Sequence, residues 1–286
     1  MNWLGRVGVG AFVLVGGALA VGLAGYRRAV AEGEDAWTRL LNPSRAPTRR
    51  FDVTDVADLP EIAQRYFRHA IAPGTPLYSG VELAMEGTFL LGDKTEFQTY
   101  QMSARQALRP PEQFVWVPRL RSGTMVIAGS DALVGGEAWT RFYLWGLIPV
   151  ANARSSQDLV RSAEFRGAIE GALWLPSTML PENAARWEQV GANAARVTLG
   201  SFSPEIVLRL TLSENGAVRE VVGQRWSNAN PEQRFRLQPF GGTMSAEATF
   251  QGLTIPAAIS VGNHFGTEAY LPFFQAGITR EVLLMR

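Results

Sequence analysis

The feature that most constrains this chain is an uncharged stretch of twenty residues, VGVGAFVLVGGALAVGLAGY, at positions 7–26. At about 1.5 Å per residue, a helix of this length extends about 30 Å, which is the thickness of a bilayer's hydrocarbon core. The apolar part of a signal peptide is shorter, roughly 7–15 residues. We therefore expect an uncleaved, single-pass transmembrane helix. A signal peptide cleaved at Ala18-Leu19-Ala20 or Ala29-Val30-Ala31 and a buried core helix remain alternatives.

The charges that flank this stretch bear on the side of the membrane. Arg6 precedes it, whereas Arg27, Arg28 and Arg39 follow it. Positively charged residues favour the cytoplasmic side, so this count places the rest of the chain in the cytoplasm. Large domains cross membranes largely regardless of charge. The sequence therefore leaves the topology open.

Composition excludes several kinds of chemistry. The 286 residues contain no cysteine, so there is no disulfide, thiolate nucleophile, cysteine-bound zinc or iron–sulfur cluster. The only histidines are His69 and His264, too few for a three-histidine metal site. A net charge of +1 gives no electrostatic reason to expect a nucleic-acid partner. With no phosphate-binding loop, dinucleotide fingerprint or nucleophile elbow, we expect no cofactor, no metal and no assigned catalytic residue.

Two helices are predicted beyond the anchor. We divide the chain into an anchor (1–28), a linker (29–57) with a short helical piece near Trp37–Leu41, and a single soluble domain (58–286). Asp58 as cap, Pro60 in the first turn and Glu61 predict a helix that ends before Pro73-Gly74. Apolar spacing predicts another over about 156–173, stopped by Pro176.

Two glycines lie in that second helix. Gly167 and Gly171 each cost about 1 kcal/mol relative to alanine in a helix. The close approach of another backbone is a reason to keep glycine at such positions. We expect such an approach here.

The remainder of the chain is organised as short strand-like runs. About a dozen occur, between residues 80 and 150 and between 186 and 286, with no alternating strand–helix repeat. Asn215-Gly216 between two of them predicts a hairpin turn, since both residues tolerate positive φ. We predict an α+β fold: an N-terminal transmembrane helix, then a mostly antiparallel, curved, half-barrel-like sheet with two main helices on its concave side.

Aromatic residues and one acidic residue are the candidates for a binding site. Eight tryptophans and fifteen phenylalanines are present, and a concave apolar pocket is the usual ligand site. The aromatic candidates are Trp116, Phe142, Trp145, Trp174, Trp226, Phe273 and Phe274. Glu170, on an apolar helix, needs a partner if buried, and Arg166 or Arg225 can supply it. The alternatives are a filled core and a structural ion pair.

Several stretches resemble an uncharacterised bacterial family that joins an N-terminal hydrophobic segment to a soluble domain. They are DLPEIAQRYFRHAIAPGTPL (58–77), QALRPPEQFVWVPRL (106–120), GLIPVANA (146–153), IEGALWLPSTMLP (169–181) and RWEQV (186–190). The strand–helix order and GLTIPAAISV (252–261) are also similar to bacterial lipoprotein-sorting and lipid-carrier domains, which are half-barrels with helices on an apolar concave face. This second resemblance implies a lipid or acyl-chain ligand and an extracytoplasmic domain, in opposition to the charge count.

These observations lead to a functional hypothesis. We expect a protein of the bacterial cytoplasmic membrane, anchored through residues 7–26, whose domain leans towards the extracytoplasmic side and holds a hydrophobic ligand in the curved sheet. The side chains expected to line the site are Trp116, Trp145, Trp174, Arg166, Glu170 and Arg225. The alternatives are an envelope structural or partner-binding protein with a filled core, and a hydrolase that uses Glu170. The sequence does not indicate the ligand or the oligomeric state.

Overall fold

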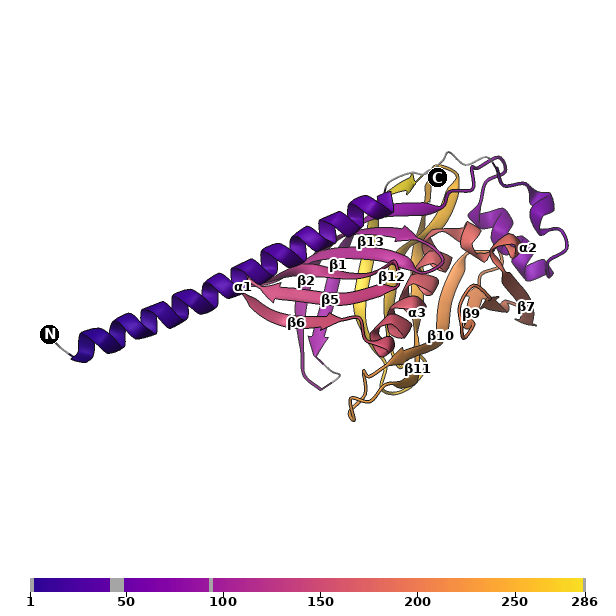
Figure 1. The fold of residues 1–286 in the computed structure, drawn as a ribbon. Coiled ribbons are helices and arrows are strands. Elements are labelled where there is room, and N and C mark those ends of the chain that lie inside the picture. The colour runs from indigo at the N-terminus through magenta and orange to yellow at the C-terminus, as the bar shows by residue number, and fades with distance from the viewer. Residues whose placement is uncertain (1–2, 42–48, 93–94, 285–286) are drawn as a thin grey trace.

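The structure is a computed structural model that describes residues 3–41, 49–92 and 95–284, with side chains described from residue 19 to residue 282 within those ranges. Its central feature is one curved, unclosed antiparallel sheet of 13 strands, with three α-helices (Figure 1). The helices are α1 (Trp3–Leu41), α2 (Glu61–Ala70) and α3 (Gln157–Trp174). The predicted α+β class and curved antiparallel sheet are confirmed. The prediction of only two main helices beyond a separate anchor is incomplete, because half of α1 also packs on the sheet.

The strand order explains how the sheet is built. In space it runs β6-β5-β4-β3-β2-β1-β13-β12-β11-β10-β9-β8-β7, so β6 and β7 are the two edges. The bounds in the first half are β1 (Gly80–Gly92), β2 (Phe97–Arg109), β3 (Gln113–Ser122), β4 (Met125–Val134), β5 (Glu137–Leu144) and β6 (Ile148–Arg154). Those in the second half are β7 (Ala185–Gly191), β8 (Ala194–Leu199), β9 (Ile206–Leu212), β10 (Val218–Ser227), β11 (Arg236–Phe250), β12 (Leu253–Asn263) and β13 (Leu271–Leu284).

Helix α3 joins the two halves of the sheet. It follows the edge strand β6 and leads, through two short 3-10 turns, to the opposite edge strand β7. On the way it lies inside the curve and contacts strands of both halves, among them β4, β5, β10 and β12 (Figure 1). Ser156 caps its first turn by accepting a hydrogen bond from the Leu159 N–H. The predicted second helix is confirmed, within one residue at each end.

The glycine prediction for α3 holds at Gly167. A Cβ placed on Gly167 would lie 2.2 Å from the backbone oxygen of Glu112, at the turn between β2 and β3. A Cβ on Gly171 would lie 3.0 Å from the ring of Pro110, a tight side-chain contact. The helix therefore approaches the sheet as closely as it does because no side chain stands at position 167.

The two faces of the sheet carry separate apolar clusters. Because side chains alternate along a strand, Phe114 and Trp116 of β3 point into the concave core with α3, whereas Val115 points to the opposite face. There Val115 is buried with Trp37 and Leu40 of α1. The carboxyl half of α1 thus covers the outer face of β2, β3 and β4, while its amino-terminal part projects beyond the strands (Figure 1).

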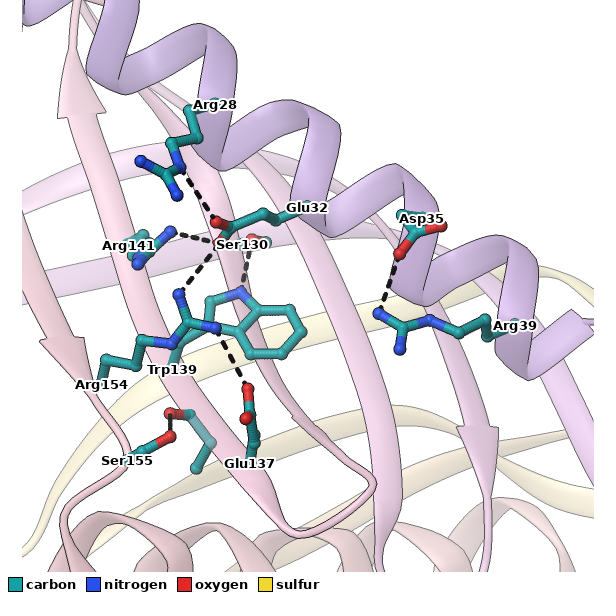
Figure 2. A network of polar contacts seen from close by, with 11 residues as sticks. Arg28, Glu32, Asp35, Arg39, Ser130, Glu137, Trp139, Arg141, Arg154 and Ser155 are labelled. Carbon is teal, nitrogen blue, oxygen red and sulfur yellow. Dashed lines mark hydrogen bonds and ion pairs between the residues drawn. The ribbon is translucent and has the colours of Figure 1, made fainter.

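Ion pairs add to this outer contact. Glu32 of α1 meets Arg141 of β5 and lies 3.6 Å from an Nη atom of Arg154 on β6, as Figure 2 shows. Beside them, the Trp139 indole N–H donates to the Ser130 hydroxyl at 2.9 Å. These ion pairs join α1 to β5 and β6, in addition to its apolar contact with β2–β4.

Several local predictions need correction. Residues 29–41 are not an irregular linker with a short helical piece near Trp37, because α1 runs unbroken to Leu41. Asp58 does not cap α2; Pro60 takes the cap position without a side-chain hydrogen bond. The capping box is instead formed by Asp52 and Asp55, around the 3-10 turn Val53–Val56.

Two strand predictions also differ. The sequence AWTRFYLWGLIPV (138–150) predicts one strand-like run, but the structure forms the β5–β6 hairpin there, which turns at Trp145 and Gly146, both with positive φ. The sequences QRFRLQPF (233–240) and TMSAEATFQ (243–251) predict two separate runs, but residues 236–250 form the single long strand β11, which bulges instead of turning. The Asn215-Gly216 turn joins β9 to β10 as predicted, with φ +98° at Gly216.

The predicted transmembrane helix is tested only in part. Within the described part of the chain, no helix combines the length and apolarity needed to cross a bilayer. The side chains of residues 7–18, which make up more than half of the predicted span, lie outside the described residues. The anchor therefore stays a prediction.

Candidate ligand-binding cavity

A cavity of about 420 Å³ lies between the concave face of the sheet and α3. This volume falls within the roughly 300–1,000 Å³ of small-molecule sites. Its wall is mostly apolar and is contributed by strands of both halves of the sheet and by α3. The aromatic residues of this wall include Phe89, Trp116, Phe142, Trp174, Phe240 and Phe274.

The aromatic wall is organised around Trp116. Its ring centroid lies 5.8 Å from that of Phe89, 6.1 Å from that of Phe142 and 6.1 Å from that of Phe274. Such tilted and edge-to-face contacts hold rings in fixed positions. The indole N–H groups of Trp116 and Trp174 are buried and have no hydrogen-bond acceptor among the described residues. Both belong to residues of the cavity wall, where an uncharged acceptor of a bound molecule could satisfy them.

A charged cluster interrupts the apolar wall. Arg166 of α3 donates to the Asp131 carboxylate of β4 at 2.5 Å and to Glu170, one helical turn further along α3, at 2.8 Å. Gln106 of β2 donates to the other carboxylate oxygen of Glu170, and the Thr140 hydroxyl donates to Asp131 at 2.9 Å. These bonds compensate the burial of two carboxylates and one guanidinium.

Burial and charge act in opposite directions on the pKa values in this cluster. Burial raises the pKa of Glu170, and the bonds from Arg166 and Gln106 only partly offset the effect. Burial acts to lower the pKa of Arg166, but Glu170 and Asp131 outweigh it, so that the pKa of Arg166 is raised. Arg166 is therefore a permanent cation that holds both carboxylates.

Arg225 of β10 is a second cation in the cavity wall. Among the described residues, no carboxylate is bonded to it. Its Nε–H donates to the Ser162 hydroxyl of α3 at 3.2 Å, and its guanidinium carbon lies 5.2 Å from the centre of the Phe240 ring. Burial, with the nearby charge of Arg166, lowers the pKa of Arg225 to about 10. It stays cationic at neutral pH, in the wall of an apolar cavity. A charged guanidinium at this position can donate charge-assisted hydrogen bonds to an acidic group in the cavity.

Five of the six predicted lining residues lie on this cavity: Trp116, Trp174, Arg166, Glu170 and Arg225. Trp145 does not. It sits in the β5–β6 turn with 52% of its surface exposed, and its indole N–H donates to the Thr124 carbonyl. Of the wider aromatic candidates, Phe142, Phe273 and Phe274 line the cavity, whereas Trp226 packs under Arg161 of α3 and donates to Asp158.

The sequence interpretation missed two polar residues of the cluster. Asp131 and Gln106 stand in strands whose neighbours are apolar, and Gln106 is fully buried. A charged or amide side chain that falls on the inward-facing register of an apolar strand is the signal that points to such residues. That register is known only once the strands are paired.

The two histidines lie outside the cavity wall. The His69 Nε2 atom is 2.9 Å from a Glu247 oxygen, between α2 and β11. His264 occupies a turn with φ +60°, and its Nε2 lies 2.8 Å from the Ala229 carbonyl oxygen. Within the described ranges, no group of three histidine or acidic side chains is placed to hold a metal ion.

A second, more superficial cavity of about 730 Å³ adjoins the first. Phe89, Leu91 and Phe273 line both. Its other residues come from the end of β1 and Thr95 after it, from the β10–β11 loop, and from the β12–β13 loop with the strand ends beside it. The inner cavity is thus bordered by a second hollow at one end of the sheet.

Comparisons with known proteins give a family and a loose structural likeness. A family model described as a family of unknown function (DUF6544) matches residues 49–276. None of the curated proteins matches the sequence. Solved structures with some likeness include a domain described as an outer membrane lipoprotein-sorting protein domain from Vibrio parahaemolyticus, 13% identical, with a TM-score of 0.34 over 78% of this chain and 91% of that one.

Two further solved structures have a similar degree of likeness. A LolA superfamily protein from Nitrosomonas europaea is 12% identical, with a TM-score of 0.37 over 78% of this chain and 91% of that one. A DUF1329 family protein from Desulfovibrio piger is 10% identical, with a TM-score of 0.33 over 78% and 90%. The two classes that the sequence resembles, an uncharacterised family and lipoprotein-sorting domains, both occur among the matches.

Proposed function

The chain belongs to the DUF6544 family, whose function is unknown, and we propose from its geometry that it binds a hydrophobic ligand in its concave face, and from its sequence that it is anchored to a membrane. The observation that carries this proposal is the 420 Å³ cavity between the sheet and α3, with its aromatic wall. A filled core would leave no such space, since protein interiors are packed about as densely as organic crystals. The alternative function, that of a purely structural protein, does not require a cavity.

The charged cluster suggests the chemistry of the ligand. An apolar chain fits the aromatic part of the wall, and a polar head group fits the part formed by Arg166, Glu170 and Arg225. Because Arg166 is already bonded to two carboxylates, Arg225 is the cation free to meet an anionic group. We infer a ligand with one apolar chain and an acidic or strongly polar head, such as a fatty acid or a lysophospholipid.

The alternative of a hydrolase that uses Glu170 finds limited support. A second carboxylate, Asp131, is close enough to share Arg166, and burial raises the pKa of Glu170 as an acid catalyst requires. Both carboxylates are nevertheless bonded within the cluster, and His69 lies elsewhere. The binding function explains the cavity without further groups, so we place it first.

The proposed location is the bacterial cytoplasmic membrane, with the uncharged residues 7–26 as anchor and the domain on the extracytoplasmic side. An anchor keeps the cavity within reach of the lipid from which a hydrophobic ligand would be collected. This location rests on the sequence pattern.

Native mass spectrometry tests the binding function. A chain that begins at Arg27 keeps Trp37 and Leu40, the residues of α1 that are buried with Val115 on the outer face; it is purified without detergent and its lipids are extracted. We expect lipid in near-stoichiometric amount, released intact. A purely apo mass that stays unchanged after incubation with vesicles would favour the structural alternative, and release of cleaved products during incubation would favour the hydrolase.

Two substitutions on one strand locate the bound lipid. Ala151 of β6 lines the cavity, whereas Ala153, two residues further along, is exposed and does not. We expect Ala151→Trp to abolish lipid retention because the indole occupies the cavity, and Ala153→Trp to leave it unchanged. Equal retention in both variants would place the lipid outside this cavity.

A further inference from the structure

One apolar surface of the molecule is exposed at the β5–β6 hairpin, at one edge of the sheet. The segment 142–153, from β5 through the turn into β6, contains twelve residues without a charge. Three of its large side chains are exposed: Trp145 by 52%, Ile148 by 49% and Val150 by 49%. We call Trp145, Ile148 and Val150 the hairpin surface. Exposed apolar groups of this size gathered in six residues mark a contact with a partner or a membrane.

The place of the hairpin along α1 indicates which partner. A Cβ on Gly22 would lie 2.1 Å from the Leu147 carbonyl oxygen, and a Cβ on Gly146 would lie 3.0 Å from the Tyr26 ring. The Tyr26 ring also packs edge-on against Tyr143, with centroids 5.6 Å apart. The tip of the hairpin is therefore held against the last turn of the uncharged stretch 7–26.

The contact between the hairpin tip and α1 sets the depth of the hairpin relative to a bilayer. If residues 7–26 span a bilayer, Tyr26 marks the level where the apolar core ends, and Gly22 lies about 6 Å inside it, at about 1.5 Å per residue. The hairpin tip then lies at the boundary between acyl chains and head groups. Tryptophan and tyrosine favour this boundary because their rings are apolar and their N–H or O–H groups are polar.

Charge supports the same level. Arg27 and Arg28 follow the uncharged stretch directly and are exposed, and the Arg28 side chain is 82% exposed although its Nε lies 3.5 Å from Glu32. Cations at this height are attracted to anionic head groups, by about 1 kcal/mol each. In this arrangement the hairpin surface lies next to these arginines, on the side of the acyl chains.

We propose that the hairpin surface docks on the lipid bilayer beside the anchor, so that the domain is held against the membrane and is not merely tethered to it. This inference rests on the anchor of the proposed function. It also gives the cavity an orientation, because Val150 of the hairpin surface and its neighbour Ala151 both line the cavity. The β6 edge of the cavity then faces the membrane, where a lipid could enter directly.

Site-specific fluorescence tests the docking. Since the natural chain has no cysteine, each introduced cysteine is a unique attachment point for a polarity-sensitive dye. The full chain is reconstituted in vesicles of phosphatidylethanolamine and phosphatidylglycerol, with the dye at Ile148→Cys. The matched control is Val207→Cys on β9, an exposed apolar residue, at 44%, in the other half of the sheet. A third variant, Val15→Cys, reports on the anchor.

We expect a blue-shifted emission at positions 148 and 15, quenched at least twofold by lipids that carry a nitroxide, and an aqueous emission at 207. Lipid quenching at 15 with an aqueous signal at 148 would overturn the docking and leave the anchored binding protein intact. An aqueous signal at position 15 would contradict both the docking and the membrane anchor. A dye at 148 that is shielded from aqueous quenchers yet insensitive to nitroxide lipids would show that a second copy of the chain covers the hairpin, and would also overturn the proposal.

Discussion

The two faces of the same sheet are covered by helices in different ways. On the outer face, α1 lies over β2–β4, and Val115, Trp37 and Leu40 are buried together. Figure 2 shows the ion pair that Glu32 of α1 adds with Arg141 of β5. On the inner face, α3 lies against the same strands but leaves a 420 Å³ cavity with a buried charged cluster. Neighbouring residues of one strand, such as Val115 and Trp116, belong to different environments. Helix α1 therefore packs closely on the outer face, whereas α3 leaves a cavity on the inner face, where we propose that the ligand binds.

The largest expected effect comes from breaking the inner cluster. Arg166→Met leaves Asp131 and Glu170 buried without their shared cation, and the loss of one partner of a buried pair costs about 3–5 kcal/mol. On the outer helix, Arg39→Met breaks only the exposed pair with Asp35, for which about 0.2–1 kcal/mol is expected. Urea unfolding measures both. Equal costs would contradict the contrast between the faces.

The next effect concerns how closely α3 approaches the sheet. Gly167→Ala is expected to destabilise by about 1–3 kcal/mol despite alanine's higher helix propensity, because the methyl group meets the Glu112 carbonyl. At Gly171 the same substitution meets the edge of a proline ring, which can shift, so a change below about 1 kcal/mol is expected. Thermal unfolding followed by circular dichroism compares the pair. A tolerated alanine at 167 would mean that the contact with Glu112 relaxes freely.

Enlarging a side chain on each face tests whether the space is real. Ile127 lines the cavity, whereas Val115 is fully buried under α1. We expect Ile127→Phe to change stability by less than about 1 kcal/mol and Val115→Phe to cost about 1–3 kcal/mol by overpacking. Chemical unfolding of both variants gives the comparison. A cost at 127 as large as at 115 would argue that the cavity closes in solution.

A different kind of effect, a change of stability with pH, is expected at Glu281 of β13, another buried group of the inner face. It is 5% exposed, with no hydrogen-bond partner for its carboxyl among the described residues, and burial raises its pKa to about 8. In the unfolded chain the pKa is about 4.3. The folded state therefore holds the proton more tightly. Its contribution to stability is complete below pH about 4.3 and is lost as the pH rises towards 8.

Glu281→Gln removes this titration. Compared with the natural chain, the variant is expected to show a flatter stability between about pH 5 and pH 8 in urea unfolding at several pH values. A matched control is Glu188→Gln, because Glu188 is exposed and paired with Arg196. If the natural chain and Glu281→Gln had parallel profiles, the carboxyl would be ionised and compensated by a group that has not been identified.

Local sequence patterns predicted much of the secondary structure. Short-range periodicity predicted α3 within a residue, the Asn215-Gly216 turn, most strands and the α+β class, because these depend on neighbours in the chain. Gly167 even indicated the close approach of another backbone. The uncharged stretch 7–26 and the absence of cysteine likewise need no structure to be recognised.

The tertiary structure decided what depends on strand pairing. Only the register of β2, β3 and β4 brings Gln106, Asp131 and Trp116 to the inner face, and only the crossing of α3 sets Arg166 between two carboxylates. The exclusion of Trp145 from the cavity and the unbroken course of α1 follow from the same long-range packing. The physical reason is that side-chain alternation fixes two faces for each strand, but which face becomes the core depends on the elements that cover it.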